Sequence, residues 1–155
     1  MNSAHLHLII NHFPIFGVLI GTLVLLTGLV LKKSDIQFTA LSIFIFSAIA
    51  SIFAFYTGEG AQEVVGNISG VSETLIHTHE EYAETFFVLI LILGITAIIT
   101  FIAKFRKARF HKHLMVITII LAIASGVMAK YVGASGGVIR HTEIRSNALV
   151  INLGD

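Results

Sequence analysis

Long uncharged stretches constrain the fold of this chain more than any other feature. Four stretches contain no Lys, Arg, Asp or Glu, and they cover residues 8–31, 36–56, 85–103 and 114–129. Each is close to the ~20 residues that an α-helix needs to cross a hydrocarbon core of ~30 Å. With 55% hydrophobic and 12% charged residues, the composition excludes a soluble domain. We therefore predict an all-α polytopic membrane protein. It has one domain (1–155), a four-transmembrane-helix bundle with spans at about 8–31, 36–56, 82–105 and 113–132.

The basic residues predict how this bundle is oriented. Seven of the ten follow the first and third predicted spans: Lys32, Lys33, Lys104, Arg106, Lys107, Arg109 and Lys112. The connection at 57–81 has no Lys or Arg. Because loops rich in Lys and Arg stay on the cytoplasmic side, we expect both termini outside, in the bacterial inner (cytoplasmic) membrane. The seven residues before the first span have no basic n-region, so that span is predicted to remain as an anchor.

Histidines gather at the predicted outer end of the bundle. Six of the eight fall there: His5, His7, His12, His77, His79 and His141. Imidazole is a common ligand of haem iron, zinc and copper, and a membrane edge is a costly place for unused polar groups. The chain has no cysteine, which excludes c-type haem attachment and cysteine-ligated iron–sulfur clusters. We expect a metal or haem site at this end.

The first predicted span carries further signals. Pro14 cannot donate a hydrogen bond to the Ile10 carbonyl, which predicts a kink or a freed carbonyl beside His12. His7 and His12 are about 140° apart around a helix, so we expect them to serve different sites or partners. Deeper in the span, three glycines form a stripe without side chains: Gly17, Gly21 and Gly28. Such a stripe allows either close contact with another helix or room for a flat macrocycle.

The third predicted helix begins near Ser72 with two histidines and three glutamates close together. On a helix, His77 shares a stripe with Glu84, whereas His79 leads into the apolar face. The carboxylates are explained either by the positive end of the helix dipole or by metal ligation. We favour His79 as the ligand of this segment.

Glycines after the fourth predicted span indicate a turn. Gly136 and Gly137 allow the chain to fold back over the bundle as a lid. His141 then supplies a ligand, and Arg140 neutralises an anionic group such as a haem propionate. Two further histidines lie in the basic connection, where binding of lipid phosphates explains them; they are His111 and His113.

The opening string His7-Leu-Ile-Ile-Asn-His12-Phe-Pro-Ile resembles the HPLLVHFPIAL-type opening of a bacterial family of small four-span membrane proteins of unknown function. Leu8 replaces the proline that the family has after the first histidine. The resemblance covers most of the chain and continues in order with Thr57-Gly58, with His77 or His79, and with Gly136-Gly137 followed by His141. It implies a shared four-helix membrane fold and shared histidine positions, and it implies no particular activity.

The leading hypothesis is a membrane b-type cytochrome, because two imidazoles from different helices hold haem iron without an open position. The predicted cofactor is one or two haem b groups, and the cofactor-binding residues are His7, His12, His79, His141 and Arg140. Such a chain is more typical of an electron-transfer subunit than of a stand-alone enzyme. Its expected partners are membrane lipid and a periplasmic or membrane redox protein, within a larger complex or a homo-oligomer, with no nucleic acid.

Two alternatives stay open. The first is a non-haem site for iron, copper or zinc with His and Glu ligands drawn from His12, Glu59, His77, His79, Glu84 and His141. Against a di-iron centre, no helix carries a Glu-x-x-His pair. The second is a structural or assembly subunit without a cofactor. So few polar groups lie within the spans that a transporter is disfavoured.

Overall fold

The structure is a computed structural model that describes residues 3–66 and 71–141. These residues form helices and no strands, which confirms the predicted all-α class. The helices are α1 (Ser3–Ile10), α2 (His12–Val30), α3 (Ser34–Val65), α4 (Glu73–Phe105) and α5 (His111–Arg140). Four helical segments are long and apolar enough to cross a membrane, with α1 and α2 together forming the first. The chain is therefore a multi-pass membrane protein.

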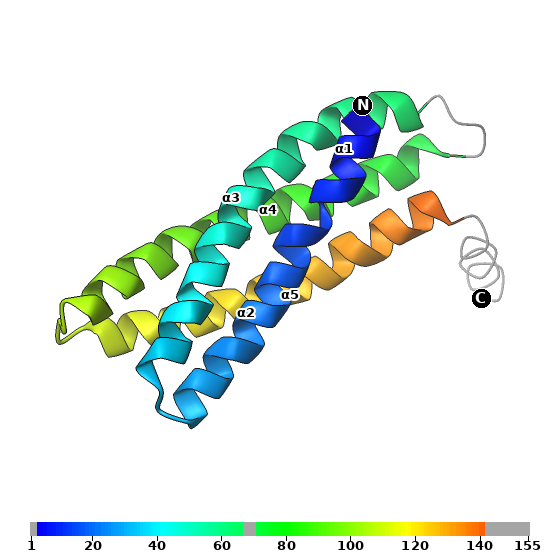
Figure 1. Cartoon of the computed structure of the whole chain (residues 1–155). Helices are drawn as coiled ribbons and strands as arrows, with labels where there is room; N and C mark the ends of the chain where they lie inside the picture. Colours follow the sequence, from blue (N-terminus) through cyan, green and yellow to red (C-terminus); the bar gives the residue numbers. More distant parts are fainter. Residues whose placement is uncertain (1–2, 67–70, 142–155) are drawn as a thin grey trace, which may run out of the picture.

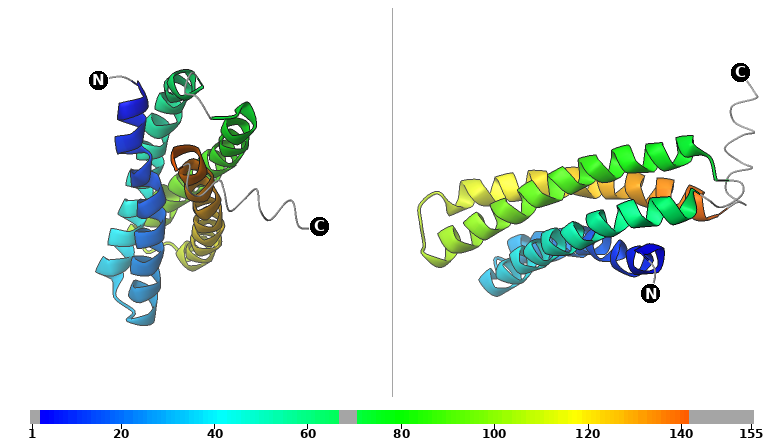
Figure 2. Two further views of the ribbon diagram at one scale, coloured as in Figure 1. Left: turned by 90° about the vertical axis from the view of Figure 1, so that its right-hand side faces the viewer. Right: turned by 90° about the horizontal axis from the view of Figure 1, so that it is seen from above.

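The helices form a long antiparallel bundle in two layers, with α1, α2 and α3 in one layer and α4 and α5 in the other (Figure 2). α2 packs on α3, α3 on α4, α4 on α5, and α5 closes the bundle against α2. One end carries the starts of α1 and α4 and the ends of α3 and α5 (Figure 1). We call it the histidine end, and we call the opposite end, with the connections at 31–33 and 106–110, the basic end.

Apolar side chains occupy both the inside and the outside of the bundle. Leu41, Phe44 and Ile90 in its centre are fully buried, whereas Leu23 and Val30 on its surface are 66% and 79% exposed. Water would make so large an apolar surface unfavourable, but hydrocarbon does not. The outer faces of the helices therefore contact lipid.

The predicted kink in the first span is confirmed. α1 ends at Ile10 and α2 begins at His12, with Asn11 between them and Pro14 buried in the first turn of α2. Figure 1 shows the two helices meeting at an angle. Because proline has no N–H to donate to the Ile10 carbonyl, the helix bends at this point. The bend directs α1 onto α3.

The glycine stripe of α2 is a helix contact. A Cβ atom built on Gly21 would lie 2.7 Å from the Phe44 ring, and one on Gly28 would lie 2.9 Å from the Gln37 backbone nitrogen. Gly17 meets the Ser47 side chain in the same way. Small residues allow the backbones of α2 and α3 to approach closely. α3 fills the stripe, so it leaves no room there for the flat macrocycle of the alternative interpretation.

Two helix ends differ from expectation. α3 continues beyond the predicted span to Val65, and α5 continues through Gly136 and Gly137 to Arg140. The hinge predicted at these glycines is therefore wrong. The His141 N–H still donates to the Gly137 carbonyl at 2.9 Å, so the helical hydrogen bonds are kept despite the ~1 kcal/mol cost of a glycine. The remainder of the proposed lid, residues 142–155, lies outside the described residues.

Candidate functional site

His7 points from α1 into the bundle at the histidine end. Its imidazole is half-buried, and its Nδ1 lies 3.0 Å from the Ala54 carbonyl oxygen and 3.3 Å from Thr57 Oγ1. A carbonyl oxygen only accepts, so Nδ1 carries the proton and donates. In the neutral ring Nε2 then keeps its lone pair. His7 is thus held by α3 in the tautomer that is able to bind a metal through Nε2.

His79 of α4 is held in the same way by α5. Its half-buried ring places Nδ1 2.9 Å from Ser135 Oγ. The Ser135 hydroxyl donates to the Val132 carbonyl at 3.1 Å, so its oxygen accepts from His79 Nδ1. Nε2 of this imidazole also keeps its lone pair. A backbone carbonyl or other acceptor on the second ring nitrogen is the usual partner of a metal-ligating histidine.

Four helices contribute to the surroundings of the two imidazoles at the histidine end, because α3 contacts His7 and α5 contacts His79. A glycine lies beside each ring: a Cβ on Gly58 would be 3.4 Å from His7 Cε1, and a Cβ on Gly136 would be 3.2 Å from His79 Cε1. Larger residues at either position would crowd the imidazoles. We call His7, His79, Gly58, Gly136 and Ser135 the paired-histidine site.

Asn11 provides a further polar atom beside this site. Its N–H donates to the His7 carbonyl at 2.9 Å, so it lies one helical turn along α1 from His7. Its Oδ1 atom is buried and accepts no hydrogen bond. A buried acceptor without a donor costs about 1–3 kcal/mol, and such atoms usually have water or a ligand as partner.

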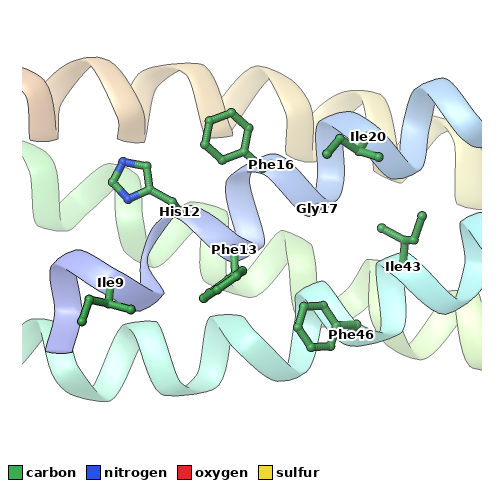
Figure 3. Close-up of a pocket in the computed structure, with 8 residues that line it drawn as sticks. All are labelled: Ile9, His12, Phe13, Phe16, Gly17, Ile20, Ile43 and Phe46. Atoms are coloured by element: carbon green, nitrogen blue, oxygen red, sulfur yellow. The ribbon is translucent and has the colours of Figure 1, made fainter.

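His12, the other predicted ligand on the first span, does not face the pair. Its ring is exposed, its Nδ1 lies 3.3 Å from the Leu8 carbonyl oxygen, and it stacks on Phe16 with the ring centroids 6.1 Å apart. It borders a groove on the outer surface of α2 (Figure 3). His7 thus contacts α3 inside the bundle, whereas His12 lies on its outer surface, and the expectation that they serve different sites or partners stays a prediction.

The remaining predicted ligands lie on the surface of the histidine end. Glu59, Glu84 and His141 are exposed, and His77 makes an exposed ion-pair contact of 3.6 Å with Glu81. Within 3–66 and 71–141, no three His, Cys, Asp or Glu side chains come together to hold a metal ion. Arg140 ends α5, but its side chain lies outside the part of the chain that the structure describes.

The sequence did not predict all residues of the paired-histidine site and its surroundings. The sequence pattern identified His7 and His79, but it did not pair them with each other, and it gave no role to Asn11 or Ser135. The available signal was weak. Thr57 and Ser135 are small polar residues near the outer ends of apolar helices, which also suits many residues at a membrane boundary.

Comparison with protein-family models, with curated proteins and with solved structures finds no match to this chain.

Proposed function

We propose that this protein is a membrane b-type cytochrome in which His7 and His79 are the axial ligands of one haem b. The observation that carries the proposal is the pair of half-buried imidazoles on different helices, each with Nδ1 hydrogen-bonded and Nε2 left to bind. The positive-inside rule puts the site on the periplasmic side of a bacterial inner membrane.

Haem suits this ligand set better than a non-haem metal does. The porphyrin brings four nitrogen ligands, so two imidazoles complete six-coordinate iron. Zinc and non-haem iron need three or more protein ligands. The described side chains offer two inward-facing imidazoles and no cluster of three ligand-type residues. One haem is therefore proposed, rather than the two allowed by the four predicted histidines.

The proposed role is electron transfer. Haem supplies a one-electron couple, and two axial imidazoles leave no open position for oxygen chemistry. The hydrogen bonds from Nδ1 to Ala54 and Ser135 fix the orientation of both rings and increase the basicity of Nε2. Stronger donation of this kind favours ferric iron. The partner class is a periplasmic or membrane redox protein, within a larger complex or a homo-oligomer.

Substitution of the two histidines tests the proposal. His7→Ala and His79→Ala should each abolish or strongly deplete the haem that copurifies with the wild-type protein. His77→Ala is the matched control, because His77 lies on the same helix as His79 but is exposed. His12→Ala should also retain haem, since its ring faces away from the pair. Haem content and helical content should be measured together.

The same set of variants can refute the proposal. Equal haem content in the His7, His79 and His77 variants, with normal helical content, would exclude the proposed axial pair. Depletion by His12→Ala alone would identify His12 as a ligand and would exclude the axial pair of His7 and His79. A wild-type protein that carries iron, copper or zinc without porphyrin would move the assignment to a non-haem centre.

A further inference from the structure

An apolar groove of about 540 Å³ runs along the outer surface of α2, beside α3. Phe13, Phe16, Ile20 and Phe46 contribute apolar side chains, and each is about half exposed. Figure 3 shows His12 and Phe16 on one side of α2, with Phe13 directed toward Phe46 of α3 on the other. The groove therefore faces lipid, because the surrounding helix surfaces are themselves apolar.

His12 is the one ionisable side chain of this groove. Its Nδ1 donates to the Leu8 carbonyl, so Nε2 of the neutral ring is an acceptor. From His12 to Ile20 the helix rises by roughly 12 Å. A lipid with a ring-sized head and an apolar tail would fill this length with its ring and the first part of its tail. A guest that fits this groove has an aromatic or apolar body and a hydrogen-bond donor at one end.

The charge pattern excludes a phosphate headgroup as the recognised feature. The chain has no Lys, Arg, Asp or Glu within 1–31 or within 36–58, and these segments supply the whole lining. A phosphate needs a cation or several N–H donors, whereas His12 offers a single acceptor. The complementary guest is an uncharged lipid with a hydroxyl-bearing ring.

We propose that this groove binds a lipid quinol, with its ring beside Phe13 and Phe16, one hydroxyl donating to His12 Nε2, and its tail along Ile20 and Phe46. Contacts of the quinol ring with two phenylalanines add to the stabilisation that simple burial gives. The oxidised quinone has no O–H to donate to Nε2. Binding should therefore favour the reduced form.

The quinol would be the electron donor of the proposed cytochrome, and this role rests on that proposed function, whereas binding itself does not. Oxidation of one quinol to a quinone breaks two O–H bonds and releases two electrons and two protons. The proposed ferric haem would take the two electrons in succession and would pass the first to the redox partner before it accepts the second; the first proton would go to His12 Nε2 and the second to water. His12 and His7 lie five residues apart on one span, a rise of about 7.5 Å, so donor and acceptor are close.

Binding can be measured with the whole protein in phosphatidylcholine nanodiscs, using decylubiquinol and decylubiquinone as probes and empty nanodiscs as the blank. The wild-type protein should bind the quinol about five to ten times more tightly than the quinone, the value of one hydrogen bond. His12→Phe keeps an aromatic ring but removes the acceptor, so it should weaken quinol binding by the same factor. His113→Phe, an exposed histidine at the basic end, should leave it unchanged.

Three results would overturn the quinol site: no binding above empty nanodiscs, equal affinity for quinol and quinone, or an unchanged quinol affinity in His12→Phe. Equal affinities would identify an ordinary acyl-chain groove. A disulfide between two copies of Phe16→Cys that blocks the quinol would identify a second copy of the chain as the occupant. Haem-free protein should still bind quinol, so loss of the haem proposal and loss of the quinol site give different results.

Discussion

His7 and His79 differ from His12 and His111 in the groups that hold their rings. Each donates from Nδ1 to an acceptor on a neighbouring helix, at 3.0 Å to Ala54 and at 2.9 Å to Ser135. His12 and His111 instead contact carbonyls within their own local segments. Because the acceptors belong to α3 and α5, the orientation of both inward rings depends on helix packing.

Loss of one acceptor should weaken the proposed site without removing a ligand. Ser135→Ala leaves His79 Nδ1 without its hydroxyl partner, and loss of such an outer partner typically lowers affinity about 10- to 100-fold. Haem transfer to a competing apoprotein should therefore be faster in this variant. Ser42→Ala is the control, because its hydroxyl bonds only to Phe38 within α3 and is exposed. Equal transfer rates in both variants would contradict the role of Ser135.

At the residue scale, the sequence predicts which histidines are candidate ligands, but it does not predict which of them lie together. The sequence favours His79 as a ligand because it leads into an apolar face, and in the structure its ring is half-buried and contacts Ser135 of α5. The pairing with His7 could not be predicted. It depends on the rotation of α1 and α4 about their axes, which the pattern of one helix alone does not determine.

Glycines serve two different purposes in the helices. Gly21 in α2 allows close approach of Phe44, whereas Gly137 near the end of α5 has no neighbour within 4 Å of a built Cβ. Both are helical, so residue type alone does not distinguish a packing contact from a turn. The small-residue stripe of α2 leaves helix contact and room for a macrocycle as alternatives, and the structure shows the helix contact; the hinge predicted at the paired glycines of α5 is wrong.

Alanine should therefore have opposite effects at these two glycines. Gly21→Ala overpacks the α2–α3 contact, with a Cβ 2.7 Å from the Phe44 ring, and should lower the free energy of unfolding by about 1–3 kcal/mol. Gly137→Ala should raise it by up to about 1 kcal/mol, through better helix propensity. Unfolding by titration with SDS measures both changes. A destabilising Gly137→Ala would indicate that the helical course of α5 there is wrong.

Helix ends were harder to predict than spans. Hydropathy locates only the part of a helix that lies in hydrocarbon. Both α3 and α4 extend beyond that part into polar sequence: α3 ends at Val65, and α4 begins at Glu73. The start of α4 was predictable because Ser72 is a good N-cap, and its Oγ accepts from the Leu75 N–H at 3.3 Å. After Tyr56, Gly58 and Gly60 are typical stop signals, but α3 continues through both of them.

The whole molecule is asymmetric along its long axis. Basic residues gather at the connections of one end, and the paired-histidine site lies at the other. In a membrane this asymmetry fixes which compartment the proposed redox site faces, because Lys-rich and Arg-rich loops stay in the cytoplasm. The orientation is a prediction from charge, since the arrangement of helices alone does not select a side.

A single introduced cysteine tests the orientation, because the chain has none of its own. Lys107→Cys at the basic end should resist an impermeant thiol reagent in intact cells and react after the cells are opened. Thr74→Cys at the histidine end should react in intact cells. The reverse pattern of labelling would place the paired-histidine site on the cytoplasmic side.

The central claim is that two imidazoles of this chain hold one haem. The most direct test is the optical and electron paramagnetic resonance spectrum of the purified wild-type protein, together with its haem and metal content. We predict one haem b per chain, low-spin in the oxidised state, with sharp visible bands on reduction and no change on adding carbon monoxide. A protein free of haem, or one whose haem is high-spin and binds carbon monoxide, would contradict ligation by both His7 and His79.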